Sequence, residues 1–271
     1  MHKLRHLTAG LIVLVAFFSL FPMYWMVIGS VKDMSNLFNG IRALIPDGLN
    51  FINFQRLFVK NDVLRWFFNS TFIASTATAV VILTNTMAGY SLAKKKFIGK
   101  EVIFWVIMGT LMLPRQVLIV PMFILMKQLH LMGSYLSIML PAIGWPLGIF
   151  LIKQFMQTLP TELLESSTID GCSELGTFFR IVVPLSKPGI GALSIFTFVG
   201  VWNDYLWQLV IITKRILVTI PLGVALLQNE FVPDYGILFA GATIAAVPML
   251  VVFLSFQKYF TSGITLGALK G

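Results

Sequence analysis

Hydrophobic residues in this 271-residue chain gather into six runs, each about long enough to cross a membrane as a helix. A helix rises about 1.5 Å per residue, so roughly 20 apolar residues cross the hydrocarbon layer of a bilayer. The runs cover residues 7–30, 66–93, 102–126, 135–152, 189–212 and 238–260. Shorter polar segments separate them. The pattern predicts an all-α, polytopic membrane protein with about six transmembrane helices, built as one transmembrane domain over residues 1–271.

The polar segments predict how the chain is oriented. The stretch KKKFIGK (94–100) lies between the second and third runs. Short basic loops stay on the cytoplasmic side of a membrane. An even number of spans then places both termini, and the polar segment 160–188, on that side. Segment 31–65 faces outward despite its five Lys and Arg residues, because long loops weigh less in this rule.

Composition supports the membrane assignment and excludes several functions. The chain is 57% hydrophobic and 11% charged, whereas soluble domains carry about 25% charged residues. The net charge of +9 is spread over loops, which predicts contact with anionic lipid headgroups and no binding of nucleic acid. One cysteine and three dispersed histidines predict no disulfide and no metal site. No catalytic constellation occurs, so the chain is not expected to be an enzyme.

The polar segment 160–188 is too charged for lipid and predicts a folded piece outside it. Thr161 can cap a helix that carries Glu162 and Glu165 in its first turn, where the helix dipole favours acidic residues. Asp170 and Gly171 interrupt this helix, because glycine readily takes the left-handed conformation that ends one. The first half of the segment therefore predicts a short acidic helix followed by a bend.

A second short helix is predicted after the bend. Ser173 can cap it, and its apolar residues share one face by their spacing of i, i+3, i+4 and i+7. Those residues are Leu175, Phe178, Phe179 and Val182. Pro184 and Pro188 are expected to end it. An amphipathic helix pair resting on lipid is the alternative, but the acidic first helix and the fixed bend favour a protein partner.

This stretch, ESSTIDGCSELGTFFRIVVPLSKP (165–188), resembles the cytoplasmic EAA loop of permease subunits in binding-protein-dependent ABC importers. The matching positions are Glu165, Asp170, Gly171, Ile181 and Pro184. Ser166 and Ser167 replace the usual alanines but are also small. The segments FFNSTFIAS, MAGYSLAKKKFIGK, GWPLGIFLIKQFMQTLP, GVWNDYLWQLVI and FQKYFTSGITLGALKG are similar to the carbohydrate, maltose-type branch, and to the second of its two permeases.

The resemblance implies a set of partners and a location. They are a second permease subunit, a pair of ATPase subunits, an extracellular solute-binding protein and a sugar-type substrate, at a bacterial or archaeal plasma (inner) membrane. The chain has no G-x-x-x-x-G-K-[ST] phosphate loop. ATP and Mg are therefore expected on the partner ATPase, and no cofactor on this chain.

The resemblance also assigns coupling residues, because the family's loop inserts into a groove on the ATPase. They are Leu163, Glu165, Ser166, Ser167, Asp170, Gly171 and Phe178. Glu165 and Asp170 are expected to make polar contacts, and Leu163 and Phe178 apolar ones. The alternative for the two acids is that they only cap and stabilise the helix.

Polar residues inside spans are costly and become candidates for the substrate path. Arg115 and Gln116 follow Pro114 in the third run. Arg115 either faces the passage, or satisfies a carbonyl freed by Pro114, or reaches toward a membrane surface.

The stretch WNDYLW in the fifth run supplies Trp202, Asn203 and Asp204, with Trp207 behind them. Aromatic faces beside amide and carboxylate groups suit a sugar. The alternative is that both tryptophans belong to an interfacial aromatic belt and that Asp204 pairs with another subunit.

The predicted function is that of a transmembrane subunit of an ATP-driven importer of a sugar or oligosaccharide. It forms half of a path that works by alternating access, and it couples to the ATPase through the EAA-type loop. The alternative is an ion-coupled secondary sugar carrier. Such carriers usually place acidic residues within their spans, and here Asp204 is the one acid expected inside a span.

Overall fold

The computed structural model describes residues 2–33, 37–40, 44–45, 48–228 and 234–268. These described residues form helices and turns and contain no strand. The chain divides into two compact units, residues 1–67 with 219–248 and residues 68–218 with 249–271. Two long helices, α3 and α14, run through both units.

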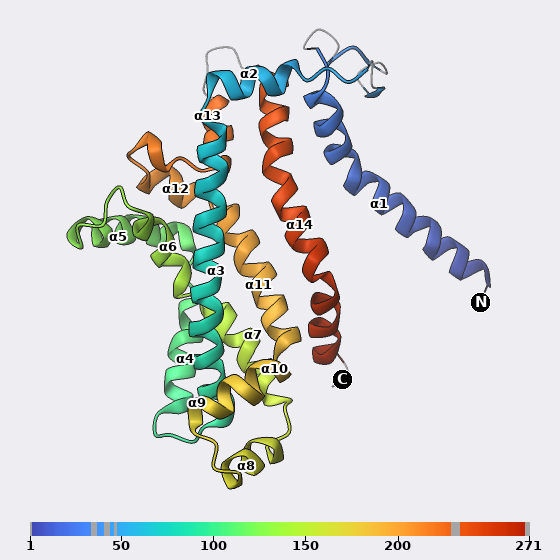
Figure 1. Cartoon of the computed structure of the whole chain (residues 1–271). Helices are drawn as coiled ribbons and strands as arrows, with labels where there is room; N and C mark the ends of the chain where they lie inside the picture. The colour runs from blue at the N-terminus through green and yellow to red at the C-terminus, as the bar shows by residue number, and fades with distance from the viewer. Residues whose placement is uncertain (1, 34–36, 41–43, 46–47, 229–233, 269–271) are drawn as a thin grey trace. The chain divides into compact units, whose positions relative to one another are not determined.

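Three helices are long and apolar enough to cross a membrane alone (Figure 1). They are α1 (His2–Ser30), α3 (Val63–Lys94) and α14 (Tyr235–Ala268). Three more candidate spans are bent pairs of helices. The pairs are α4 (Lys100–Thr110) with α5 (Arg115–Gln128), α6 (Tyr135–Ile143) with α7 (Pro146–Gln157), and the helical stretch Glu174–Leu185 with α11 (Lys187–Trp202). The prediction of an all-α protein with about six spans is confirmed.

Three of the predicted runs are broken. The run 135–152 bends by 43° between α6 and α7. The run 102–126 bends by 101° between α4 and α5. Pro114 disfavours helical geometry at the residue before it and has no N–H to donate. The run 189–212 stops at Trp202 and resumes as α12 (Tyr205–Ile211). Arg115 therefore begins a helix, and Asn203 and Asp204 lie in a break; none of them sits inside a continuous span.

In the first unit the expected outer segment contains one described helix, α2 (Ile52–Lys60). Its Asn53 side chain donates to the carbonyls of Ser30 and Lys32, at 3.1 and 2.7 Å. Its Arg56 forms an ion pair of 2.5 Å with Asp234, just before α14. Helix α2 is thus tied to the end of α1 and the start of α14.

The second unit holds two apolar clusters along α3. The first packs residues of α3, α6, α11 and α12, and the second packs residues of α3, α7 and α11 with those of the helical stretch Glu174–Leu185. The first includes Ile73, Ala77, Met139, Phe198, Trp202, Trp207 and Ile211. The second includes Val81, Tyr90, Ile152, Met156, Phe178, Val182 and Leu193. Gly148 lets α7 approach α3 closely, because a Cβ there would lie 2.2 Å from the amide nitrogen of Asn85. Tight packing along α3 holds this unit together.

Candidate coupling site and substrate path

The polar segment 160–188 folds into two helices joined at a sharp bend. The first is α8 (Glu162–Ile169), with Glu162 and Glu165 in its first turn. At its end the N–H of Gly171 donates to Thr168 and the N–H of Cys172 to Ser167, at 3.1 and 2.9 Å. This bonding pattern defines a Schellman cap, which needs a left-handed residue after the helix. Gly171 has φ +76° and supplies it, as predicted.

The two predicted helix starts differ in the structure. The Ser173 hydroxyl accepts a hydrogen bond of 3.1 Å from the Gly176 N–H and caps α9 (Glu174–Thr177), as predicted. The Thr161 side chain forms no cap on α8. Its hydroxyl lies 3.4 Å from the ammonium of Lys94, so it faces the end of α3 instead of the first amides of α8.

The helical stretch after the bend runs from Glu174 to Leu185 and ends between Pro184 and Pro188, as predicted. After α9 the chain makes a π-helical turn (Phe178–Val182) and continues as α10 (Val183–Leu185) and α11. Pro184 and Pro188 stand in the first turns of α10 and α11. A missing N–H is tolerated there, since first-turn amides have no partner within the helix. The prolines thus start helices, and the chain turns by 79° between them.

The predicted apolar face of the second helix is divided. Phe178 and Val182 are buried at 3% and 0% exposure, whereas Leu175 and Phe179 are exposed. A π-helical turn holds more residues than an α-helical turn, so α-helical spacing no longer aligns side chains across it. The docking role predicted for Phe178 does not fit its position, because its ring packs inside this chain against Tyr90, with centroids 5.6 Å apart.

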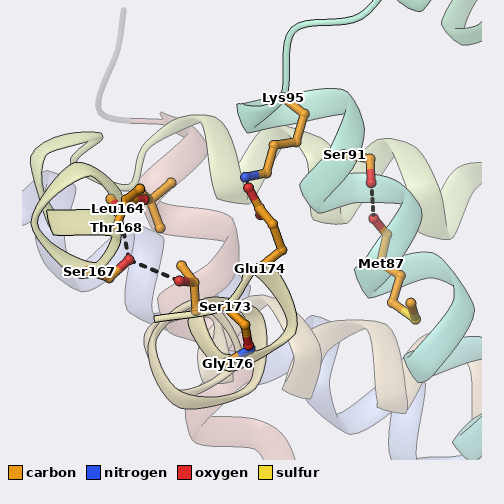
Figure 2. Close-up of polar contacts among 10 residues, drawn as sticks. Met87, Ser91, Lys95, Leu164, Ser167, Thr168, Ser173, Glu174 and Gly176 are labelled. Atoms are coloured by element: carbon orange, nitrogen blue, oxygen red, sulfur yellow. Dashed lines mark hydrogen bonds and ion pairs between the residues drawn. The ribbon is translucent and has the colours of Figure 1, made fainter. Parts of the chain in front are cut away.

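Small polar residues join the two helices. The hydroxyls of Ser167 on α8 and Thr177 on α9 share a hydrogen bond of 2.9 Å, and both residues are buried (Figure 2). Ser167 also donates to the Leu164 carbonyl in its own helix. A larger residue at position 167 would push the helices apart. Ser167 therefore shapes the segment from within and does not face outward.

The end of α3 contacts the chain near the start of each helix of this pair. The Lys94 ammonium donates to the Leu159 carbonyl before α8, at 2.5 Å. Lys95 forms an ion pair with Glu174 at the start of α9, and Figure 2 shows the two side chains reaching toward each other. The Lys95 ammonium also lies over the Tyr90 ring, 5.1 Å from its centroid. Burial acts to lower the pKa of Lys95, but Glu174 and Tyr90 outweigh it, and the net effect raises that pKa.

The remaining predicted coupling residues lie on the surface of the segment. They are Leu163, Glu165, Ser166, Asp170 and Gly171. Ile169 was not among the predicted coupling residues, although it is 86% exposed at the end of α8. A large apolar residue directly before Asp170-Gly171, in a polar stretch, was a signal for it. With Leu163, Leu175 and Phe179 it gives the helix pair exposed apolar side chains.

The two helix breaks meet at an ion pair. The guanidinium of Arg115, at the first position of α5, lies 2.8 Å from a carboxylate oxygen of Asp204. The other carboxylate oxygen accepts from the Trp207 N–H at 3.4 Å and caps α12. Asn203 donates to the Met249 sulfur at 3.0 Å, and Gln116 is exposed beside Arg115. The partner of Arg115 in this structure is Asp204 of the same chain, a pairing that none of the interpretations of the sequence included.

The two tryptophans of the WNDYLW stretch are buried and form no interfacial belt. Trp202 is 1% exposed and stacks on Phe198, with ring centroids 5.6 Å apart. Trp207 donates its indole N–H to the Ser137 carbonyl at 3.0 Å. The sugar-stacking role predicted for Trp202 does not fit this position. Within the described part of the chain, no cluster of three His, Cys, Asp or Glu side chains could hold a metal ion.

Comparison with known proteins fits this architecture. Residues 85–266 match the family model described as "Binding-protein-dependent transport system inner membrane component". The arabinooligosaccharides transport system permease protein AraQ of Bacillus subtilis is 37% identical, over 93% of this chain and 91% of its own length. The lactose transport system permease protein LacG of Rhizobium radiobacter is 36% identical, over 95% and 93%.

A solved structure shares the fold. It is a bacterial ABC transporter described as importing the acidic polysaccharide alginate; one of its chains matches with a TM-score of 0.83 and 20% identity, covering 96% of this chain and 97% of that chain. The trehalose/maltose transport system permease protein MalG of Thermococcus litoralis is 29% identical over 96% of this chain. The chain belongs to the family of inner membrane components of binding-protein-dependent transport systems.

Proposed function

We propose that this chain forms half of the translocation path of an importer for sugars or oligosaccharides. A second permease forms the other half, a pair of ATPase subunits binds ATP and Mg, and an extracellular binding protein delivers the substrate. The folded helix pair of the polar segment carries this proposal, because it offers a shaped surface that lipid binding does not require. Family membership supports it and gives no support to an ion-coupled carrier.

The helix pair is the surface that meets the ATPase. Leu163 and Ile169 supply exposed apolar side chains, and Glu165 on α8 and Asp170 directly after it supply carboxylates. Apolar anchors with polar groups around them are the usual composition of a protein interface. Closing of the ATPase pair on ATP then pulls the helix pair and the helices joined to it. A ligand thereby biases a rigid-body movement between inward-facing and outward-facing states.

The substrate class follows from the relatives and from the ion pair. AraQ, LacG and MalG are named for arabinooligosaccharides, lactose and trehalose/maltose. Arg115 is 69% exposed and Asp204 18% exposed, so the guanidinium can still donate to a ligand. Charged donors and acceptors that converge at one point suit the hydroxyl groups of a sugar. Arg115, Gln116, Asn203 and Asp204 are the candidate contacts.

Both termini and the polar segment lie on the cytoplasmic side in this proposal, because Lys94, Lys95, Lys96 and Lys100 form a short basic loop beside the segment. Cys172 is the one cysteine and lies half-buried at the bend. A membrane-impermeant maleimide should label it in inverted membrane vesicles and not in right-side-out ones. Labelling in right-side-out vesicles would overturn the orientation and with it the ATPase contact.

ATP hydrolysis by the assembled complex tests the function. We expect the chain to co-purify with a second permease and an ATPase pair. The addition of the binding protein with its sugar should then raise the ATPase rate over that of either one alone. A panel of neutral oligosaccharides, acidic sugars and sugar phosphates identifies the substrate class. Uptake by the chain alone, driven by a proton or sodium gradient, would instead establish the ion-coupled carrier.

A further inference from the structure

Helix α3 is one continuous α-helix, and most of it lies in the second unit. It runs from Val63 to Lys94 over 32 residues, which corresponds to about 48 Å. Three other candidate spans are pairs of helices bent by 43° to 101°. A bent pair can flex at its break, whereas a continuous helix carries a displacement along its length. Residues 68–94 of α3 lie in the second unit with the polar segment.

The end of α3 near Lys94, here called its inner end, contacts the helix pair and the segments beside it at three separate points. Lys94 holds the Leu159 carbonyl before α8, Lys95 pairs with Glu174 on α9, and the Tyr90 ring packs on Phe178 after α9. These contacts come from both sides of the bend. The helix pair is therefore fixed to α3 as well as to α7 and α11, its neighbours in the sequence.

Asn69, about 38 Å along the same helix from Lys94, anchors the other end. It is 1% exposed. Its amide nitrogen donates to the carbonyls of Ile216 and Val218, both at 2.8 Å. Its carbonyl oxygen accepts from the Tyr135 hydroxyl at 2.7 Å. Both amide hydrogens of Asn69 thus hold the segment after α12, and its carbonyl oxygen holds the start of α6.

This anchor leads to the ion pair at the helix breaks. Tyr135 begins α6, and two residues later the Ser137 carbonyl accepts from the Trp207 indole. The backbone N–H of Trp207 donates to Asp204, the partner of Arg115. Hydrogen bonds, joined by the short backbone stretch from Tyr135 to Ser137 and by the Trp207 residue itself, therefore connect Asn69 with the candidate substrate contacts.

We propose that α3 relays the movement of the helix pair to the substrate path, with Lys95 and Asn69 as the positioning residues at its two ends. The inference rests on the proposed function and names the route by which that function works. Spatial continuity alone does not establish coupling between two sites; a measured dependence of one on the other does. Both ends must hold for the relay to work, so a change at either should cost coupling without costing assembly.

A charge exchange tests the inner end in the assembled complex with its binding protein. Lys95→Glu and Glu174→Lys should each lower sugar-stimulated ATP hydrolysis at least about fivefold, the lower range of measured couplings between sites. The double variant Lys95→Glu with Glu174→Lys restores the opposite charges and should recover stimulation. Basal ATPase activity and co-purification with the ATPase serve as readouts of the docked interface. Wild-type stimulation in both single variants, or no recovery in the double variant, overturns the relay.

Tyr135→Phe tests the outer end with a small change, since it removes one hydroxyl and keeps the ring. Thr84→Ala is the matched control, because the Thr84 hydroxyl bonds to carbonyls of α3 itself. Tyr135→Phe should lower sugar stimulation while Thr84→Ala leaves it unchanged. Effects at distant, independent sites add as free energies. Tyr135→Phe combined with Lys95→Glu should lose little more than the stronger single variant, because both interrupt one route.

The outcomes separate this inference from the proposed function. Additive losses in the combined variant, with a wild-type complex that responds to sugar, overturn the relay alone. A wild-type complex that forms with no ATPase, or that no sugar stimulates, overturns the proposed function before any variant is compared.

Discussion

Replacement of Gly171 by proline is expected to abolish sugar-stimulated ATP hydrolysis while the chain still inserts into the membrane. Gly171 has φ +76°, and the proline ring holds φ near −65°. Proline also lacks the N–H that donates to the Thr168 carbonyl. Both bonds of the cap at the end of α8 depend on this geometry, so α8 would leave the chain in another direction and no longer fit its partner.

Gly171→Ala is the matched control for this variant. A Cβ at position 171 would meet nothing within 4 Å, so alanine adds only the strain of a left-handed residue, about 1–2 kcal/mol. We expect a partial loss of stimulation with alanine and a complete loss with proline, measured as ATPase rate with and without sugar-loaded binding protein. Equal, wild-type rates in both variants would show that the bend has no role in coupling.

Glu165→Lys, on the exposed face of α8, completes this set. It should weaken co-purification with the ATPase, whereas the loss in Gly171→Pro follows from the altered direction of α8.

Signals in short stretches of the sequence predicted much of the fold. The apolar runs predicted the spans, and the Asp170-Gly171 and Ser173 signals predicted the bend and the cap of α9. Each of these features depends on a few neighbouring residues: a left-handed glycine, or a hydroxyl three positions before an N–H. Such features can be read from one stretch of sequence without knowledge of what packs around it.

The predictions that do not fit the structure concern features that depend on tertiary packing. The apolar run 102–126 gives no sign of a bend of 101°, apart from Pro114. The resemblance to the EAA loop gave Phe178 a docking role, but a π-helical turn and the Tyr90 ring place its side chain inside. Trp202 was assigned to substrate for its chemistry, and the structure uses its surface against Phe198. No local pattern in the sequence distinguishes an aromatic ring that is buried from one that binds.

The pairing of Arg115 with Asp204 could not be predicted from the sequence either. The two residues lie 89 positions apart, and each was considered separately. Their contact depends on two helix breaks, one after Thr110 and one after Trp202. A polar residue at a helix break is thus a stronger candidate for function than its hydropathy suggests, since the break frees backbone groups and brings side chains from separate spans together.

Asp204→Ala is expected to lower sugar uptake by roughly ten- to a hundredfold, the range of a charged hydrogen bond worth about 1.5–3 kcal/mol. Assembly should change little, because Arg115 is 69% exposed and an exposed ion pair contributes about 0–1 kcal/mol to stability. The loss of the α12 cap should lower the free energy of unfolding by a further ~1 kcal/mol.

Asp204→Asn distinguishes the two roles of the carboxylate. The asparagine oxygen can still accept from the Trp207 N–H and cap α12, but it carries no charge for Arg115. If the ion pair serves substrate, Asp204→Asn and Arg115→Ala should both lower uptake at unchanged co-purification with the ATPase, and the affinity for different sugars should shift. If uptake falls in Asp204→Ala and stays at the wild-type level in Asp204→Asn and Arg115→Ala, the carboxylate serves only to begin a helix. The affinity of transport for several sugars, measured in proteoliposomes, decides between the two, because a cap acts on folding alike for every substrate and a binding group does not.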